Sequence, residues 1–586
     1  MKTKPSIRLM LIVTGLMAVV CISTWSGRDE FAAPGIAEVE KNHARASGAV
    51  PVSDWPQHAA GATVQASATT AAAPPAAPAT ASPQPAWVFQ EFKAVQARAA
   101  DAVLHLRKFS PSEERPDFGW QGQGFSPEHP LQLQRDALAA WHEARFWQAK
   151  AHAWEVALAK GWAVKGPGFE LMRIDTNGTP LYATTTNANA RISTGVTQTQ
   201  NVSPYNTGGA LTGSIFRVGV WDGGSIRTTH QEFGSRASVM DGSANDDHAT
   251  HVGGTIGAAG VQAAALGMAP AVSLRSYDWN SDVAELLSAG ATTATSLNTA
   301  VGFSNHSYGW ISGWDEDGGV WRWYGRQGDR ESDLFGRYSD ESRDYDDLAT
   351  KIPFTLIFKS AGNDRNDSAP SSGTSFTYVP GGTVKAYNST TDPFNDGYDS
   401  GYDTIGGGFG SSKNIMTVGA ANDAVSAGVR NPSSATITSF SGFGPVDDGR
   451  VKPDIVANGA SLYSPLSGST TAYGNYSGTS MSTPNATGSA VLLQELYWRN
   501  FSNTAMRADL LKALIIHTAD DIGNAGPDYT YGWGLMNVKA AADLILSHKA
   551  TPAANTLVLG MLNNTTATSA TYQFEWNGSG PLRVTL

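Results

Sequence analysis

The sequence predicts an α/β fold with a mainly parallel sheet for its central region, on two observations. Between residues 200 and 548, short apolar runs such as 216–220, 354–358 and 415–418 alternate with helix-like segments. This alternation is typical of buried parallel strands joined by helices. The 586 residues include 41% hydrophobic side chains, 16% charged side chains and 62 glycines, which indicates a large core with many tight turns. We expect functional groups at the carboxyl ends of the strands.

The charge balance and the cysteine count exclude several classes of protein. Asp and Glu total 52 against 41 Lys and Arg, for a formal net charge of −11. A nucleic-acid partner is therefore not expected, because it would need clustered positive charge. Cys21 is the one cysteine of the sequence, so neither an intramolecular disulfide nor a cysteine-rich zinc site can form.

The first 26 residues have the pattern of an export signal. Three basic residues precede an apolar run over 9–22, and small residues follow at 23 and 26. A membrane anchor is the alternative, but the run is short for a span of about 20 residues. A lipid anchor on Cys21 is disfavoured by the bulky Val20 before it. We expect a secreted or extracytoplasmic protein (periplasm or cell surface) without stable membrane association.

Three further segments flank or precede the central region. Residues 27–87 are rich in Ala and Pro and are predicted to be a linker. Residues 88–190 are predicted to form an α+β unit with a helix over 131–158 and a hairpin around Asn177-Gly178. Residues 552–586 contain three strand-like runs, which we expect to be the start of a C-terminal β-domain that is cut short, since three strands make a poor domain.

Three residues of the central region form a set suited to nucleophilic acyl transfer. Asp222 ends an apolar strand, His248 begins a small-residue helix, and Ser480 lies just before a helical run. Each alone is ordinary, since an Asp after a strand is often a turn residue and a Ser before a helix is often an N-cap. Together they supply a nucleophile, a base that titrates near neutral pH and a carboxylate that orients the base.

The motifs around these residues resemble those of the subtilisin-like serine proteases (peptidase family S8, subtilases). The nucleophile segment is GTSMSTP at 478–484, with Ser482 where the family has Ala, and the histidine segment is HATHVGG at 248–254. The chain order Asp, His, Ser is also that of the family. The resemblance covers about 210–545 and implies a three-layer α/β domain over 200–548, with His248 catalytic and His251 structural. Asn458, where the family commonly has Pro, is a departure.

The resemblance extends to segments that bind substrate and stabilise charge. Asn363, within SAGND at 360–364, corresponds to the oxyanion-hole asparagine; its amide is a suitable donor beside the N–H of Ser480. Extended substrate is expected to add a strand to the edge formed by 307–309. The resemblance implies that the walls of the first pocket, which holds the residue before the scissile bond, are Ser307, Tyr308, Gly309, Ser360, Ala361 and Gly362. The floor of the pocket is not identified.

Three regions keep two interpretations each. The Trp-rich insertion 310–350 is predicted to be a packed subdomain, with a substrate rim as the alternative. The acidic loop 392–403 is predicted to be solvated, with calcium binding as the alternative; catalysis is expected to need no cofactor, and the metal ligands stay unknown. The position of 88–190 fits the inhibitory pro-segment of a zymogen, or a permanent accessory domain.

These observations predict a secreted serine endopeptidase that is a monomer and cleaves polypeptides through an acyl-enzyme. The alternative is a catalytically silent, peptide-binding protein of the same fold. An esterase of the α/β-hydrolase type is disfavoured, because the sequence has no Gly-x-Ser-x-Gly elbow and its triad order differs.

Overall fold

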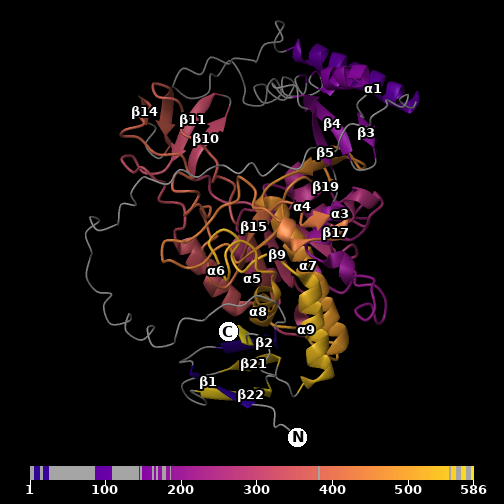
Figure 1. Cartoon of the computed structure of the whole chain (residues 1–586), viewed down its shortest axis with the longest axis vertical. Helices are drawn as coiled ribbons and strands as arrows, with labels where there is room; N and C mark the ends of the chain where they lie inside the picture. Colours follow the sequence, from indigo (N-terminus) through magenta and orange to yellow (C-terminus); the bar gives the residue numbers. More distant parts are fainter. Residues whose placement is uncertain are drawn as a thin grey trace, which may run out of the picture.

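The structure is a computed structural model of the whole chain, and parts of the chain are described in it. The described residues are 6–12, 17–24, 86–108, 144, 148, 150–160, 164–166, 169–174, 180–184, 187–317, 319–379, 383–552, 556–561, 569–575 and 582–585. Almost all of the predicted linker, 27–87, lies outside them. Figure 1 shows the central domain between two smaller groups of elements, one at each end of the long axis.

A seven-stranded sheet forms the centre of the molecule, in the order β18-β15-β12-β9-β6-β8-β7. Every described pair of neighbours in it runs parallel. The strands are β6 (Arg217–Asp222), β7 (Ala237–Val239), β8 (Ser273–Asp278), β9 (Phe303–His306), β12 (Leu356–Ser360), β15 (Met416–Ala421) and β18 (Ile455–Asn458). The predicted α/β class with a mainly parallel sheet is confirmed.

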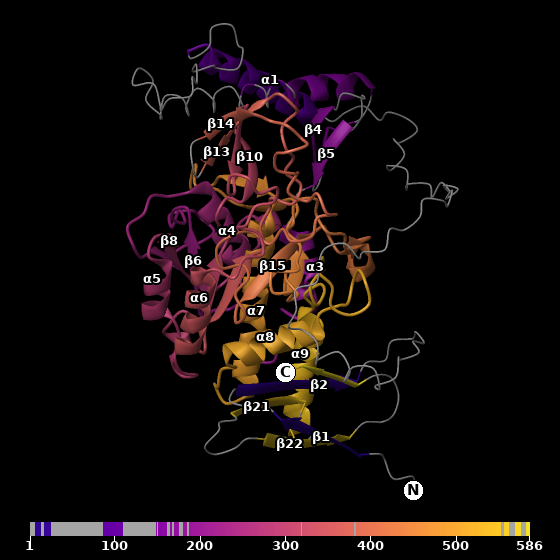
Figure 2. The same ribbon diagram turned by 90° about the vertical axis from the view of Figure 1, so that its left-hand side faces the viewer.

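Helices cover both faces of this sheet and make it the middle of three layers. One face packs with α4 (Asp247–Gly257) and α7 (Thr479–Asn500), and the other with α5 (Asp282–Ala289) and α6 (Asp340–Lys351). Strand β12 shows the alternation: Phe358 belongs to the core cluster of the first face and Ile357 to that of the second. Figure 2 shows α5 and α6 on one side of the strands, with α8 (Ala508–Thr518) and α9 (Val538–Ala550) below.

Strand β6 ends at Asp222, as predicted. The run at 354–358 becomes β12, which continues to Ser360. The difference arises because Ser360 is also buried, at 5% exposure, so a polar residue ends a strand that a hydrophobic pattern alone cuts short.

The central domain begins earlier than the predicted boundary at residue 200. Helix α3 (Asn187–Ser193) and the short helix Val196–Gln198 precede that boundary, and Ala190 and Val196 belong to the main core. The carbonyl of Ser193 accepts a hydrogen bond from Arg430 (2.8 Å). Residues 187–199 therefore pack as part of the central domain.

The unit before the central domain has helices and a hairpin, as predicted. Helix α1 spans Ala86–Leu106, and the part of the predicted 131–158 helix that lies within 150–160 is helical. Strands β4 (Phe169–Ile174) and β5 (Pro180–Thr184) pair antiparallel, with β3 (Lys165–Gly166) beside β4. The expected Asn177-Gly178 turn lies outside the described residues.

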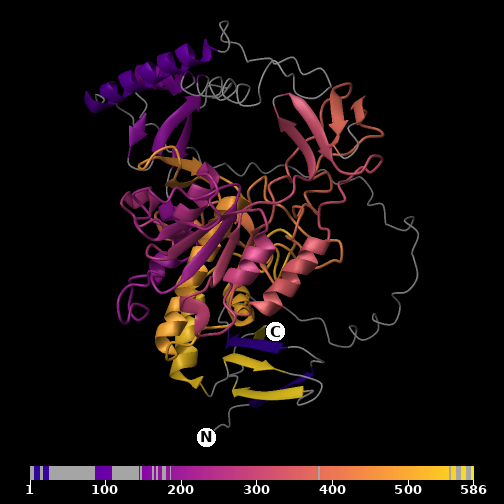
Figure 3. The ribbon, with the colours of Figure 1, turned by 180° about the vertical axis from the view of Figure 1, so that it is seen from behind.

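The Trp-rich insertion 310–350 supplies two strands of a small sheet whose other two strands come from residues 375–386; Figure 3 shows this sheet apart from the central strands. Its order is β10-β11-β13-β14. The strands are β10 (Gly313–Asp317), β11 (Val320–Tyr324), β13 (Ser375–Tyr378) and β14 (Thr383–Ala386). Trp314 and Trp323 are each 1% exposed and pack with Phe376 and Tyr387. The insertion therefore has the packed core that the subdomain interpretation predicted.

The two ends of the sequence pair with each other. The predicted export signal contributes β1 (Ser6–Ile12) and β2 (Met17–Thr24), and the predicted C-terminal strands are β21 (Leu557–Met561), β22 (Ser569–Glu575) and β23 (Leu582–Thr585). They form the sheets β1-β22 and β21-β2-β23. The C-terminal runs are strands as predicted, but they pair through β1 and β2 instead of with one another.

No helix among the described residues is long and apolar enough to span a membrane.

Candidate active site

Asp222 lies at the carboxyl end of β6, near the middle of the parallel sheet. Its neighbour Trp221 is fully buried between two rings, with centroid distances of 4.3 Å to Tyr277 and 5.2 Å to His306. This packing fixes the end of the strand. The Asp222 carboxylate, 2% exposed, accepts a hydrogen bond from the N–H of Gly223 (2.8 Å).

His248 is the second residue of α4 and contacts Asp222 directly. The helix begins here because the carboxylate of Asp246 caps it, accepting from the N–H of Ala249 (2.8 Å). The Nδ1 atom of His248 lies 2.8 Å from Oδ1 of Asp222. Since a carboxylate oxygen can only accept, Nδ1 carries the proton and Nε2 is left as the basic atom. The His248 side chain is 34% exposed, so Nε2 can be reached from solvent.

The electrostatic surroundings favour the protonated form of His248. Burial lowers its pKa, but the charge and hydrogen bond of Asp222 and the charge of Asp246 outweigh burial and raise the pKa above its usual value. The nearby His251 differs: burial lowers its pKa to about 3. Its Nε2 donates to the carbonyl of Leu462 (2.8 Å). His251 is thus a neutral, packed imidazole, as the structural role implied by the resemblance requires.

Ser480 is the second residue of α7, and the structure gives its hydroxyl a partner that the sequence did not suggest. Its Oγ donates to the carbonyl of Ser307 (3.0 Å), and Oγ of Ser307 donates back to the carbonyl of Ser480 (3.0 Å). Within the described part of the chain, no hydrogen bond joins Ser480 to His248. The structure therefore brings nucleophile, base and carboxylate to one edge of the sheet without closing the Ser–His hydrogen bond.

Asn363 lies beside Ser480 with its amide N–H groups available. Its Oδ1 accepts two hydrogen bonds from Thr479, one from the backbone N–H (2.8 Å) and one from Oγ1 (2.9 Å). Neither Nδ2 of Asn363 nor the N–H of Ser480 donates to any described residue, so both remain free at the start of α7. Thr479, which orients Asn363, was not predicted as a site residue, although its place in the GTSMSTP motif was a signal.

The predicted walls of the first pocket lie at the carboxyl ends of two adjacent strands. Residues 307–309 follow β9 and residues 360–362 end and follow β12, and these strands pair in parallel, with His306 opposite Lys359. The side chain of Tyr308 turns away toward α5, where its hydroxyl donates to Asp282. Tyr308 therefore contributes its backbone, rather than its ring, to the wall.

A third segment, missed from the sequence, closes the space behind these walls. Gly407 forms an antiparallel bridge with Trp310, and a Cβ added to Gly309 would lie only 3.1 Å from the Gly407 carbonyl oxygen. The approach requires glycine on both chains. The run of three glycines at 406–408 was the available signal, but a glycine run predicts a close approach without naming its partner.

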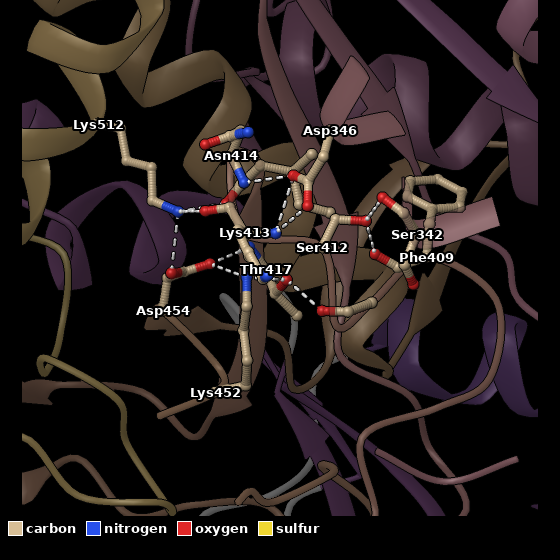
Figure 4. A network of polar contacts seen from close by, with 12 residues as sticks. Ser342, Asp346, Phe409, Ser412, Lys413, Asn414, Thr417, Lys452, Asp454 and Lys512 are labelled. Atoms are coloured by element: carbon tan, nitrogen blue, oxygen red, sulfur yellow. Dashed lines mark hydrogen bonds and ion pairs between the residues drawn. The ribbon is translucent and has the colours of Figure 1, made fainter. Parts of the chain in front are cut away.

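Helix α6 and the core hold this segment in place. Ser339, the N-cap of α6, donates to the Gly408 carbonyl (3.0 Å). Asp346 accepts from the N–H groups of Lys413 (2.9 Å) and Asn414 (2.7 Å), as Figure 4 shows. The same network continues through the buried ion pair of Lys452 and Asp454 (2.6 Å). Segment 407–414 is thereby tied to rigid elements.

The acidic loop 392–403 differs from the solvated loop that was predicted. Asp392 and Asp396 are 1% and 4% exposed. Asp392 pairs with Lys385 (2.5 Å), and Asp396 accepts from the N–H of Trp314 (2.9 Å). The prediction of a solvated loop is wrong for these two residues, because the insertion sheet packs over them. Calcium binding in this loop stays an untested prediction.

Serine, imidazole and carboxylate gathered at one edge of a parallel sheet, beside two free N–H donors, are the arrangement that serine hydrolases use. The subtilase family model (Peptidase_S8) matches residues 223–534, more than half of the chain. The chain belongs to the subtilase family of serine-type peptidases. The matched part contains His248, Asn363 and Ser480 and begins directly after Asp222.

Curated relatives agree over shorter stretches. The extracellular serine protease of Serratia marcescens is 44% identical over 69 residues, 12% of this chain and 6% of that protein. Subtilisin E of Bacillus subtilis (strain 168) is 42% identical over 91 residues, 15% and 20% of the two chains. The PI-type proteinase of Lactococcus lactis subsp. cremoris is 30% identical over 160 residues, 24% and 8%. The chain thus spans at most a fifth of the length of these relatives.

Among solved structures, the CspB protease of Clostridium perfringens aligns with a TM-score of 0.43 and 16% identity, covering 61% of this chain and 99% of that one.

Proposed function

We propose that this protein is an exported serine endopeptidase that hydrolyses peptide bonds of proteins through an acyl-enzyme. Asp222, His248 and Ser480 are the triad, and Asn363 with the N–H of Ser480 is the oxyanion hole. Polypeptide substrates bind along 307–309, with the residue before the scissile bond between 307–309 and 360–362. The N-terminal export pattern and the extracellular Serratia relative support export.

The proton path follows from the tautomer of His248. With Nδ1–H held by Asp222, Nε2 accepts the Ser480 proton as Oγ attacks the substrate carbonyl. The resulting oxyanion receives hydrogen bonds from Ser480 N–H and Asn363 Nδ2. His248 then protonates the leaving amine, and a water molecule repeats the sequence to release the acyl group. For this to occur, Ser480 Oγ must leave the Ser307 carbonyl and turn to His248.

One observation carries the proposal: two hydrogen bonds from Thr479 occupy Oδ1 of Asn363 and leave its Nδ2 free beside the free N–H of Ser480. Asn363 is exposed, so its Nδ2 donors are open to an incoming substrate. Two N–H donors that are already in place beside a serine can stabilise the negative charge that develops there during the reaction.

A fluorophosphonate probe on the protein recovered from culture medium tests the proposal. The wild type should be labelled at Ser480 and should cleave casein, because the phosphonate reports a serine made nucleophilic by its base. Ser480→Ala should lose both, and Ser482→Ala, two residues further along α7, should keep both. Absence of the protein from the medium, the periplasm and the cell surface would contradict export, and the intact mass of the labelled species would locate any processing of 88–190.

The catalytically silent, peptide-binding protein remains the second candidate, and the Ser480–Ser307 hydrogen bond favours it. A serine whose proton is directed to a backbone carbonyl is not activated by its histidine. If the secreted wild type is not labelled although it binds casein, this candidate replaces the peptidase.

A further inference from the structure

Lys359 is a buried lysine directly beneath the predicted first pocket. It is the fourth residue of β12, is 2% exposed, and shares the α5–α6 face of the sheet with Ile357. Its ammonium group donates to the carbonyl of Ser360 (2.9 Å) and to Oγ of Ser360 (3.0 Å). Ser360 belongs to one wall of the pocket, so the ammonium group is hydrogen-bonded to the wall itself.

The same ammonium group also lies beside the other wall and the closing segment. A Cβ added to Gly309 would lie 3.4 Å from Nζ of Lys359 and 3.1 Å from the carbonyl of Gly407. The Phe409 ring centroid lies 5.5 Å from the nitrogen. Lys359 Nζ therefore lies close to both predicted walls and to segment 407–409.

This charge has no direct counter-charge. Among the described residues, no carboxylate oxygen lies within the 4.0 Å of an ion pair with Lys359, whereas the other fully buried lysine, Lys452, pairs with Asp454 at 2.6 Å. Burial lowers the pKa of Lys359 to about 8. A buried ammonium group held by neutral oxygens is costly, and two hydrogen bonds leave one of its three N–H donors unused.

The nearby acids do not neutralise it directly. Glu341 of α6 is half-buried and accepts from Nε1 of Trp310 (2.7 Å). Burial raises the pKa of Asp364 to about 7, so a large part of this side chain is uncharged at neutral pH. His306 faces Lys359 from β9, and burial holds its pKa well below the usual value, so it is neutral. A positive potential therefore remains beside the two predicted walls.

We propose that Lys359 determines the specificity of the first pocket and favours substrates with Glu or Asp before the scissile bond. The inference rests on the proposed function and on the predicted pocket walls. A substrate carboxylate would supply the missing counter-charge in a site shielded from water, where charge pairs are strongest. A basic residue at the same position would meet like charge and be rejected.

Peptide p-nitroanilides that differ only in the last residue test the proposal, with Glu and its uncharged isostere Gln as the matched pair. For the wild-type full chain at pH 6.5, kcat/KM should be about tenfold or more higher for Glu than for Gln. Lys359→Met should bring the ratio to one or below by lowering kcat/KM for Glu alone. Retained hydrolysis of the Gln peptide shows that the variant folds.

A second variant should shift selectivity in the opposite direction. Glu341→Gln removes the carboxylate whose charge acts on Lys359, so the Glu-to-Gln ratio should rise. A wild-type ratio of one or below, or a ratio unchanged in Lys359→Met, would overturn the role of Lys359 while leaving the peptidase intact. Absence of both hydrolysis and phosphonate labelling would overturn the proposed function, and the specificity with it.

Discussion

Asp246 places a second negative charge beside the His248–Asp222 pair. A carboxylate oxygen of Asp246, a ring nitrogen of His248 and an oxygen of Asp222 all lie within 4.8 Å of one another. Asp246 also caps α4. The same side chain thus starts the helix that carries His248, and its charge helps to raise the pKa of the imidazole.

The charge of Asp246 should affect the pH dependence of kcat/KM. Because His248 must be neutral to accept the serine proton, kcat/KM should fall as the pH drops through its raised pKa, which lies above the usual value of 6.5. Asp246→Asn should move this acidic limb to lower pH, since Asn caps a helix as well as Asp but carries no charge. Asp247→Asn is the matched control: Asp247 binds Ser467 and should leave the limb in place. An unmoved limb in Asp246→Asn would contradict the assigned effect.

At the scale of elements, α6 acts as a support for segment 407–414 behind the first pocket. Asp346 is 8% exposed and accepts from the hydroxyl of Tyr338 (2.8 Å) as well as from the Lys413 and Asn414 N–H groups. Among the described residues, these three donors make no hydrogen bond to any other side chain, so the Asp346 carboxylate joins the helix to the loop. Figure 4 shows the Asp346 carboxylate between α6 and the backbone of Lys413 and Asn414.

Loss of the hydrogen bonds to Asp346 should lower the free energy of unfolding. Asp346→Ala should lower the free energy of unfolding by about 1–3 kcal/mol, because it leaves buried N–H groups without an acceptor. Asp344→Ala, on the same helix, removes a side chain that is 53% exposed and should change stability by less than about 0.5 kcal/mol. Urea denaturation followed by tryptophan fluorescence measures both. Equal effects of the two substitutions would show that the Asp346 joint is not a stabilising contact.

Strand and helix positions were largely predictable at this scale, and their ends were not. Apolar runs marked β6, β12 and β15 within about two residues, because a strand buried on both faces needs apolar side chains on both. The polar residues that end these strands are buried by tertiary contacts: Ser360 Oγ, for example, reaches the carbonyl of His306 on β9 (3.5 Å). A hydrophobic pattern carries no information about such contacts.

At the scale of the whole molecule, several carboxyl groups are buried between the insertion sheet and the central domain. Burial raises the pKa of Asp364 to about 7, of Asp367 to about 6 and of Asp396 to about 9. The acids also act on one another. The charge of Asp367 raises the pKa of Asp364, and the charges of Asp364 and Asp367 raise the pKa of Asp396. These three side chains therefore favour the folded state more when they are protonated than when they are charged.

The contribution of these carboxyl groups to stability should fall as the pH rises. A carboxyl group whose pKa is raised in the folded state binds its proton more tightly there than in the unfolded chain, so folding loses free energy between the unfolded value of 3.8 and the folded value. For Asp364 this window runs from about pH 4 to about pH 7. Asp364→Asn should therefore gain stability relative to the wild type across that window. Midpoints of urea unfolding from pH 4.5 to 7.5 test this, and parallel profiles for the two proteins would contradict it.

The sequence by itself determined the parallel α/β fold, the order Asp222, His248, Ser480 and the place of Asn363, because each depends on residues adjacent in the chain: a strand pattern, a helix start, a motif. Only the tertiary structure decided the rest. It brought Lys359 and Gly407 close to Gly309, buried Asp392 and Asp396, placed Thr479 where it donates to Asn363, and directed Ser480 to Ser307. These depend on contacts between strands and loops far apart in sequence, 173 residues for Ser307 and Ser480, and such contacts exist only once the layers have packed.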